Sequence, residues 1–149
     1  MSMITDYIWI GSYDDVCNTQ MLNAWRINHV MCCANELPLR AGFPYSKERI
    51  GYKVPIVDNM ADEKTMDRFL EGAAKLNEWI SQGNRVIVHC MAGMSRSVSV
   101  VITYLMVYKG WSFRTSYDLV RLRRWQTDIY PGFMRVLEEI KRNPRHNQV

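Results

Sequence analysis

The chain has 149 residues, 48% of them hydrophobic and 23% charged, a balance typical of one globular domain with a buried core. No apolar stretch approaches the roughly 20 residues that span a membrane, and residues 1–6 lack the basic start and apolar run of a secretory signal, so neither is expected. The net charge of +4 suits an anionic substrate and does not by itself indicate nucleic-acid binding.

Hydrophobic periodicity predicts strands and helices that alternate along most of the chain. Strands are expected at 7–11, 29–33, 50–57 and 85–89, and helices at 17–25, 65–81, 96–109, 113–124 and 131–142. Gly110 is expected to end one helix and Ser112 to cap the next. Helices accumulate at the C-terminal end, which predicts an α/β fold with a short, central, mostly parallel sheet flanked by helices.

This pattern predicts a single domain over 1–149, with a core at about 4–142 and a polar tail at 143–149. The connection around 42–45 carries two aromatic residues that either border the functional site or pack on the edge of the core.

Residues 89–97 are the most informative segment and read His-Cys-Met-Ala-Gly-Met-Ser-Arg-Ser. They lie between the predicted strand at 85–89 and an apolar run at 98–106 that is typical of a buried helix. A strand, a glycine-containing loop and a helix N-terminus form an anion pocket, because backbone N–H groups and the helix dipole converge there. The expected binding positions are Met91, Ala92, Gly93, Met94, Ser95 and Arg96.

Side chains of this segment point to phosphoryl transfer through sulfur. Arg96 can bind two phosphate oxygens with its planar guanidinium. Cys90 lies where the same field favours a thiolate, which is a nucleophile. Ser97 can donate its hydroxyl to that sulfur when it departs, and His89 is expected to orient the loop through hydrogen bonds rather than to act as a base.

Phosphoryl transfer of this kind also needs a general acid for the leaving oxygen. Asp58 is the first candidate, because it ends the strand-like stretch at 52–57 and opens a polar segment. Asp62 is the second candidate, although it is more simply the N-cap of the helix that follows.

The four cysteines lack the spacing of a disulfide framework. A thiolate nucleophile needs a reducing compartment, so the cytoplasm or the nucleus is expected.

With these motifs the sequence resembles the cysteine-dependent protein tyrosine phosphatases, in particular the small atypical dual-specificity phosphatases. The resemblance extends from about residue 4 to residue 140 and is carried by 8–12, 54–58, 89–97, 104–106, 120–124 and 132–134. It implies that Cys90 forms a phosphocysteine, that Arg96 clamps the phosphate, that Asp58 acts first as acid and then as base, and that Ser97 assists release of the thiolate. It implies no metal and no cofactor, and a phosphorylated protein as the substrate.

Two departures from that family bear on specificity and regulation. The family often has Pro-Asn-x-Gly-Phe before its last helix, where this chain has Tyr-Pro-Gly-Phe at 130–133. Many relatives carry Asn at the position of Cys32, and some carry a Cys that forms a reversible disulfide with the nucleophile. Cys32 is therefore a candidate redox partner of Cys90, and the alternative is that Cys32 and Cys33 are two inert buried thiols.

The preferred function is hydrolysis of phosphotyrosine, together with phosphoserine and phosphothreonine. The alternatives are an RNA 5′-phosphatase or a phosphoinositide phosphatase of the same superfamily, or a module that binds phosphoproteins without turnover. The loop at 89–97 contains no Lys, which counts against a phosphoinositide substrate, and it ends in Ser-Arg-Ser, which counts against an RNA substrate. Arg121 and Arg124 are expected to share a solvated helix face. The alternative is that Arg124 binds acidic flanking residues or a second phosphate of the substrate.

Overall fold

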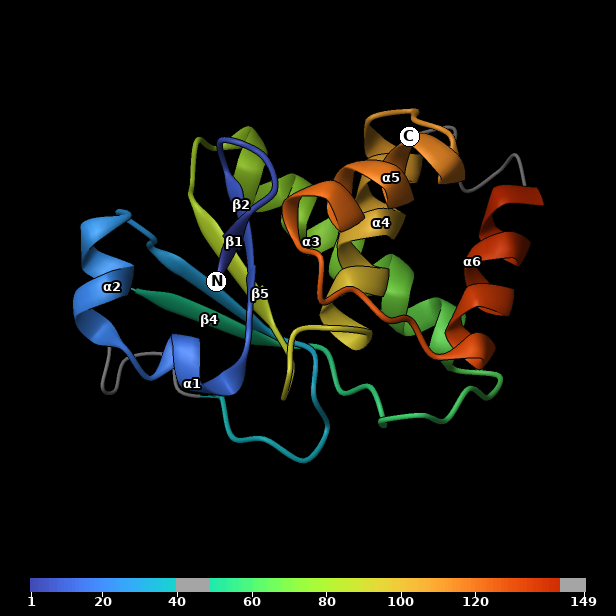
Figure 1. Cartoon of the computed structure of the whole chain (residues 1–149), viewed down its shortest axis with the longest axis horizontal. Coiled ribbons are helices and arrows are strands. Elements are labelled where there is room, and N and C mark those ends of the chain that lie inside the picture. The colour runs from blue at the N-terminus through green and yellow to red at the C-terminus, as the bar shows by residue number, and fades with distance from the viewer. Residues whose placement is uncertain (40–48, 143–149) are drawn as a thin grey trace.

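A computed structural model describes residues 1–39 and 49–142, so the connection at 42–45 and the tail at 143–149 lie outside the described residues. Its five strands form one sheet in the order β1-β2-β5-β3-β4 (Figure 1). The strands are β1 (Ser2–Met3), β2 (Ile8–Gly11), β3 (His29–Cys32), β4 (Ile50–Lys53) and β5 (Val86–His89). β2, β5, β3 and β4 pair in parallel, and β1 pairs antiparallel with β2. The mostly parallel sheet of the predicted α/β fold is thereby confirmed.

Six helices surround this sheet among the described residues: α1 (Tyr13–Val16), α2 (Thr19–Ala24), α3 (Thr65–Ser81), α4 (Arg96–Tyr108), α5 (Phe113–Arg123) and α6 (Pro131–Arg142). Ser112 caps α5 as expected, because its hydroxyl accepts from the N–H of Thr115 at 3.0 Å. Gly110 separates α4 from α5 with φ +69°, a conformation that glycine adopts without strain. None of these helices is both long and apolar enough to span a membrane.

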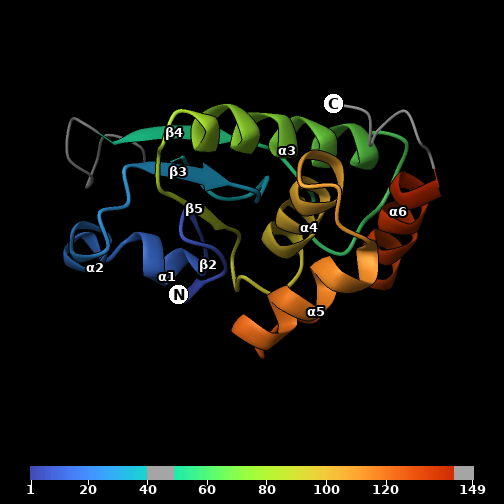
Figure 2. The ribbon, with the colours of Figure 1, turned by 90° about the horizontal axis from the view of Figure 1, so that it is seen from above.

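The helices divide between the two faces of the sheet (Figure 2). α3 to α6 pack on one face and enclose the main core, in which the rings of Phe69 and Phe133 meet edge to face at 5.5 Å. α1 and α2 cover the other face, where Trp9, Leu22 and Ile87 form a smaller core. α4 is buried from Arg96 to Val107, which explains why most of its residues from Val98 onward are apolar.

The sequence reading of two segments differs from the structure. The predicted strand at 50–57 ends at Lys53, two residues before Pro55, which has no N–H to donate to a neighbouring strand. The carbonyl of Ile56 is instead free to accept from Asn35 N at 3.0 Å and from Arg96. The predicted helix at 17–25 is shortened to α2, and the short helix α1 before it was not predicted.

The loops that follow β3, β4 and β5 meet at one end of the sheet, along the lower edge of the molecule in Figure 1. Parallel strands direct their carboxyl ends to the same edge, which is where α/β folds bind ligands. This arrangement brings together residues from the segments 33–39, 54–64 and 90–95.

Candidate active site

The loop at 90–95 connects β5 to α4, and its shape depends on Gly93. This residue has φ +69°, and a β-carbon at its position would lie 2.6 Å from the carbonyl oxygen of Gly11 and 2.7 Å from Nη2 of Arg124. Any larger side chain would therefore clash with the neighbouring strand. Close contact between loop and strand requires glycine here.

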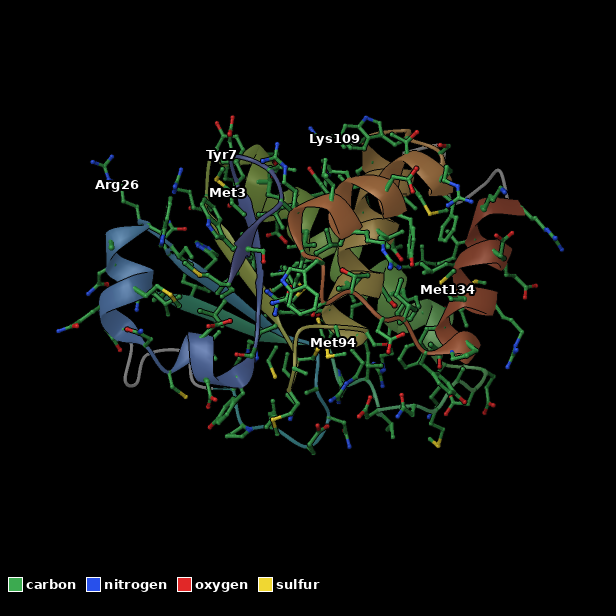
Figure 3. All side chains as sticks on the ribbon, viewed as in Figure 1. Met3, Tyr7, Arg26, Met94, Lys109 and Met134 are labelled. Atoms are coloured by element: carbon green, nitrogen blue, oxygen red, sulfur yellow. The ribbon has the colours of Figure 1, made fainter. Side chains whose placement is uncertain are left out.

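Neighbouring segments hold the outside of the loop. Tyr13 N donates to the carbonyl of Met91 at 3.0 Å, and Asp128 N donates to the carbonyl of Met94 at 3.0 Å. Tyr130 N donates to Oγ of Ser95 at 2.9 Å. Met94 lies where the loop turns towards α4, at the lower centre of Figure 3. Each of these bonds uses an acceptor of the loop and none uses its N–H groups, which remain for an anion.

Arg124 also stabilises the loop, through hydrogen bonds to its backbone carbonyls. It is 4% exposed, and its Nε donates to the carbonyl of Gly93 at 2.6 Å while Nη2 donates to that of Ala92 at 3.2 Å. Nη1 donates to the carbonyl of Ile10 at 3.2 Å and to Ser2 Oγ at 3.0 Å. Both expectations for Arg124, the solvated face and the second-phosphate site, are wrong, because the side chain turns inward to satisfy these carbonyls.

Cys90 and Ser97 meet at the base of the pocket. Their Sγ and Oγ atoms are 3.3 Å apart, and both residues are buried. Ser97 lies in the first turn of α4, so the helix holds its hydroxyl in place. This is the geometry that the sequence reading expected of a hydroxyl that stabilises a departing thiolate.

Arg96 opens α4 and presents one edge of its guanidinium to the pocket. Nη1 donates to Glu36 Oε1 at 2.6 Å and to the carbonyl of Ile56 at 3.0 Å, and Nη2 donates to Glu36 Oε2 at 2.8 Å. A guanidinium has five N–H donors, so these three bonds leave Nε–H and one Nη2–H, which lie on the same edge. Two parallel donors on one edge match two oxygens of a phosphate.

Glu36 was missed by the sequence reading. It lies in the loop after β3, and its bidentate pair with Arg96 fixes the plane of the guanidinium. The bond from Arg96 lowers the pKa of Glu36. Burial alone would lower the pKa of Arg96, but the bond to Glu36 and the neighbouring negative charges outweigh it and raise that pKa. The available signal was an acidic residue just beyond a strand that neighbours β5.

The two candidate acids occupy different places. Asp58 lies in an open pocket of about 260 Å³ that Cys90 and Arg96 also line, and its Oδ1 is 3.7 Å from Nε of Arg96. Asp62 lines a separate cavity, and its Oδ1 accepts from the N–H of Lys64 at 2.8 Å. Asp62 is not the N-cap of α3, which is Lys64, but it closes the turn before it.

His89 is buried at the end of β5, where its Nδ1 lies 3.2 Å from the carbonyl oxygen of Cys90. Because a carbonyl only accepts, this contact assigns the ring proton to Nδ1. Burial lowers the pKa of His89 to about 4, so the ring is neutral near pH 7. A neutral ring bonded to the loop is consistent with the predicted orienting role.

Cys32 lies in one small cluster with Cys90, Ala34 and Leu37, whereas Cys33 belongs to the main core. Burial raises the pKa of both thiols, that of Cys33 more strongly. The redox pairing of Cys32 with Cys90 stays a prediction.

Comparison with known proteins identifies the family to which this site belongs. Residues 8–143 match the family model described as dual specificity phosphatase, catalytic domain. The chain belongs to the dual-specificity phosphatase family. Dual specificity protein phosphatase 1B of Arabidopsis thaliana is 33% identical over 147 residues, which cover 99% of this chain and 85% of that protein. The chain is therefore a protein phosphatase that acts on phosphorylated proteins.

Solved structures share the fold of this phosphatase at lower identity. The crystal structure of DUSP15 superimposes with a TM-score of 0.83 at 21% identity, covering 99% of this chain and 92% of that one. PTPMT1, solved in complex with PI(5)P, superimposes with a TM-score of 0.74 at 18% identity, and the match covers 93% of this chain and 92% of that one. At these identities the likeness concerns the fold alone.

The role of Glu36 can be tested with Glu36→Gln. The amide keeps one acceptor but loses the charge and the bidentate pair, so Arg96 is held less firmly. We expect kcat/KM to fall roughly tenfold, mainly through KM, with a loss of about 1.4 kcal/mol in transition-state stabilisation. Steady-state kinetics on a phosphopeptide measures this, and Glu63→Gln, an exposed glutamate on the segment that follows Asp58, is the control. A value within twofold of wild type contradicts the assignment.

The neutral state of His89 predicts a pH-dependent stability. An unfolded histidine titrates near 6.5, so between about pH 6.5 and pH 4 the unfolded chain binds a proton that the folded protein excludes. The free energy of unfolding therefore falls as the pH is lowered through this window, by about 2 kcal/mol at pH 5 from this residue.

Urea unfolding at pH 7 and pH 5 measures this loss. His89→Asn retains a side-chain donor and does not titrate, so it is expected to lose correspondingly less stability than wild type. Equal losses in the two proteins would show that His89 is not the group responsible.

Proposed function

We propose that this phosphatase hydrolyses phosphotyrosine, phosphoserine and phosphothreonine in proteins through a phosphocysteine on Cys90. The observation that carries the proposal is the position of Cys90 Sγ, 3.3 Å from Ser97 Oγ at the base of a pocket shared with Arg96 and Asp58. A nucleophile, an anion clamp and a proton donor thus face one space.

In the first step the Cys90 thiolate attacks phosphorus, and the bond from phosphorus to the side-chain oxygen of the substrate breaks. The free N–H groups of Arg96 and of the loop bind the phosphoryl oxygens as their charge redistributes. Asp58 gives its proton to the leaving oxygen, which departs as the hydroxyl of tyrosine, serine or threonine.

In the second step water attacks the phosphocysteine. Asp58, now a carboxylate, takes a proton from that water, and the bond from phosphorus to sulfur breaks. The sulfur leaves as a thiolate, and Ser97 stabilises it by donating its hydroxyl. The products are inorganic phosphate and the regenerated Cys90.

Dual specificity is supported by the open shape of the pocket. The space is about 260 Å³ and open, and Met91 and Ala92 on its edge are exposed. We infer that a pocket this open admits the short side chains of phosphoserine and phosphothreonine as well as phosphotyrosine. The thiolate chemistry further supports a reducing compartment, the cytoplasm or the nucleus.

Lipid and RNA substrates are the second class of candidates, and PTPMT1, a structural neighbour, was solved with PI(5)P. A phosphate-rich headgroup needs several cations. Arg96 is the only cationic residue of the described chain that lines this pocket. The charges of the pocket therefore favour a phosphoprotein as the substrate. The presence of the nucleophile Cys90 also disfavours the alternative that the protein binds phosphoproteins without hydrolysing them.

Hydrolysis of paired phosphotyrosine and phosphothreonine peptides tests the proposal, in reductant and EDTA, with Cys90→Ser alongside. We expect turnover of both peptides by wild type and none by the variant, because the hydroxyl of serine is not ionised near pH 7. Turnover of phosphotyrosine alone would contradict dual specificity. Turnover of PI(5)P or of RNA 5′-triphosphate without that of either peptide would replace the proposal.

The general acid is tested by comparing Asp58→Asn with Asp62→Asn. Asp58→Asn is expected to lower turnover of a phosphothreonine peptide roughly 10²–10⁴-fold, because an alkoxide is a poor leaving group without a proton. An aryl phosphate whose leaving group departs without a proton should lose much less. Asp62→Asn is the matched control, and if it alone loses activity the acid has been misassigned.

A further inference from the structure

The charges around the pocket are unevenly distributed. Among the residues that the structure describes, three charged ones line it: Asp58, Asp128 and Arg96. Arg96 is already paired with Glu36, and its two remaining N–H donors suffice for one phosphate. Once that phosphate is bound, the charges left on the lining for the rest of the substrate are carboxylates. Of these, Asp58 is engaged in proton transfer, so Asp128 is the one that a neighbouring substrate residue meets.

The position of Asp128 is fixed by its backbone. Its N–H donates to the carbonyl of Met94 at 3.0 Å, which ties it to the phosphate-binding loop. On one side Thr127 is buried and its hydroxyl donates to the carbonyl of Arg124 at 2.8 Å. On the other side Ile129 is buried, and Tyr130 N donates to Ser95 Oγ. The backbone of Asp128 is therefore fixed beside the phosphate-binding loop, and its exposed side chain lines the pocket.

Three cations of the described segments 1–39 and 49–142, Arg124, Lys64 and Arg68, are placed so that they do not pair with this carboxylate. Arg124 donates to Ser2 and to three carbonyls, so its guanidinium is not available to an anion of the substrate. Lys64 and Arg68 line a different cavity of about 210 Å³, which borders the segment 55–60 and does not include Cys90. Arg68 also bridges to Glu71 at 3.3 Å.

We propose that Asp128 is a specificity-determining residue that directs this phosphatase to singly phosphorylated sites with a basic residue beside the phosphorylated one. An arginine or lysine there is attracted by Asp128, whereas a second phosphate or a glutamate is repelled. The inference rests on the proposed protein phosphatase function and names the substrate class within it.

Three phosphopeptides with the same phosphorylated residue test this inference, with neutral, arginine or phosphoserine neighbours. For wild type we expect kcat/KM to be roughly fivefold higher for the arginine peptide than for the phosphoserine peptide at low salt, the effect of one exposed charge pair. The ratio should shrink as salt rises. Asp128→Asn should bring the ratio close to one, and Asp128→Lys should invert it.

Asp118→Asn is the matched control, because Asp118 is an exposed aspartate on α5 that pairs only with Arg114 among the described residues. It should keep the wild-type ratio, and thermal unfolding should show that the Asp128 variants remain folded. Equal kcat/KM for the three peptides in wild type, with clear turnover of the neutral one, overturns this inference alone. A preference for the phosphoserine peptide that Lys64→Ala removes also overturns it and assigns recognition to the neighbouring cavity. No turnover of any peptide overturns the proposed function and this inference together.

Discussion

The buried guanidinium of Arg124 is the interaction on which the shape of the phosphate-binding loop depends. It joins four acceptors from three parts of the chain: Ser2 in β1, Ile10 in β2, and Ala92 and Gly93 in the loop. Burying a cation is costly unless its donors find partners, and here four of the five N–H donors bond to three backbone carbonyls and one hydroxyl. The loop carbonyls are thereby held away from the pocket, and a peptide unit whose C=O points outward directs its N–H inward. The bonds from Arg124 to the outward-facing carbonyls thus leave the N–H groups of the same peptide units directed into the pocket, where they form an anion site.

Two arginines of this site illustrate how the partner decides the role of a side chain. Arg124 donates to three backbone carbonyls and the Ser2 hydroxyl, all of them neutral acceptors of the protein itself, so it is structural. Arg96 uses three of its five donors on Glu36 and Ile56 and keeps one edge for the substrate. Lysine could fill neither place, because a single ammonium lacks the planar, multidentate geometry that both positions use. The same geometry explains why Glu36 matters although its side chain is 46% exposed: two parallel bonds define a plane, whereas a single bond would not.

Local motifs were predictable from the sequence, and contacts between distant segments were not. The loop at 89–97 is contiguous, so strand, glycine, arginine and helix are read together, and Ser97 follows from its place one residue after Arg96. Asp58 could be named as a candidate because an acidic residue at the end of a strand-like stretch is also a local signal, and the structure places it in the pocket. Glu36 is 60 residues from Arg96, and Arg124 is 31 residues from Gly93, and neither pairing has a local signature. Arg124 was misplaced because helical spacing sets it beside Arg121, whereas it lies just past the end of α5, where the chain turns inward.

The two carboxylates around Arg96 are held in different ways, one by hydrogen bonds to the guanidinium and one without them. Glu36 makes two short charge-assisted bonds, and these lower its pKa, so it stays an acceptor throughout the reaction. Asp58 lies 3.7 Å from Nε, too far for a hydrogen bond, and its side chain is 57% exposed. The next residue, Asn59, has φ +50°, a left-handed conformation that asparagine tolerates, and the turn there redirects the chain immediately after the acid. Asp58 is thus placed at the pocket by the turn of the backbone instead of by hydrogen bonds to its carboxylate, and in the proposed mechanism its oxygens are available to the leaving group.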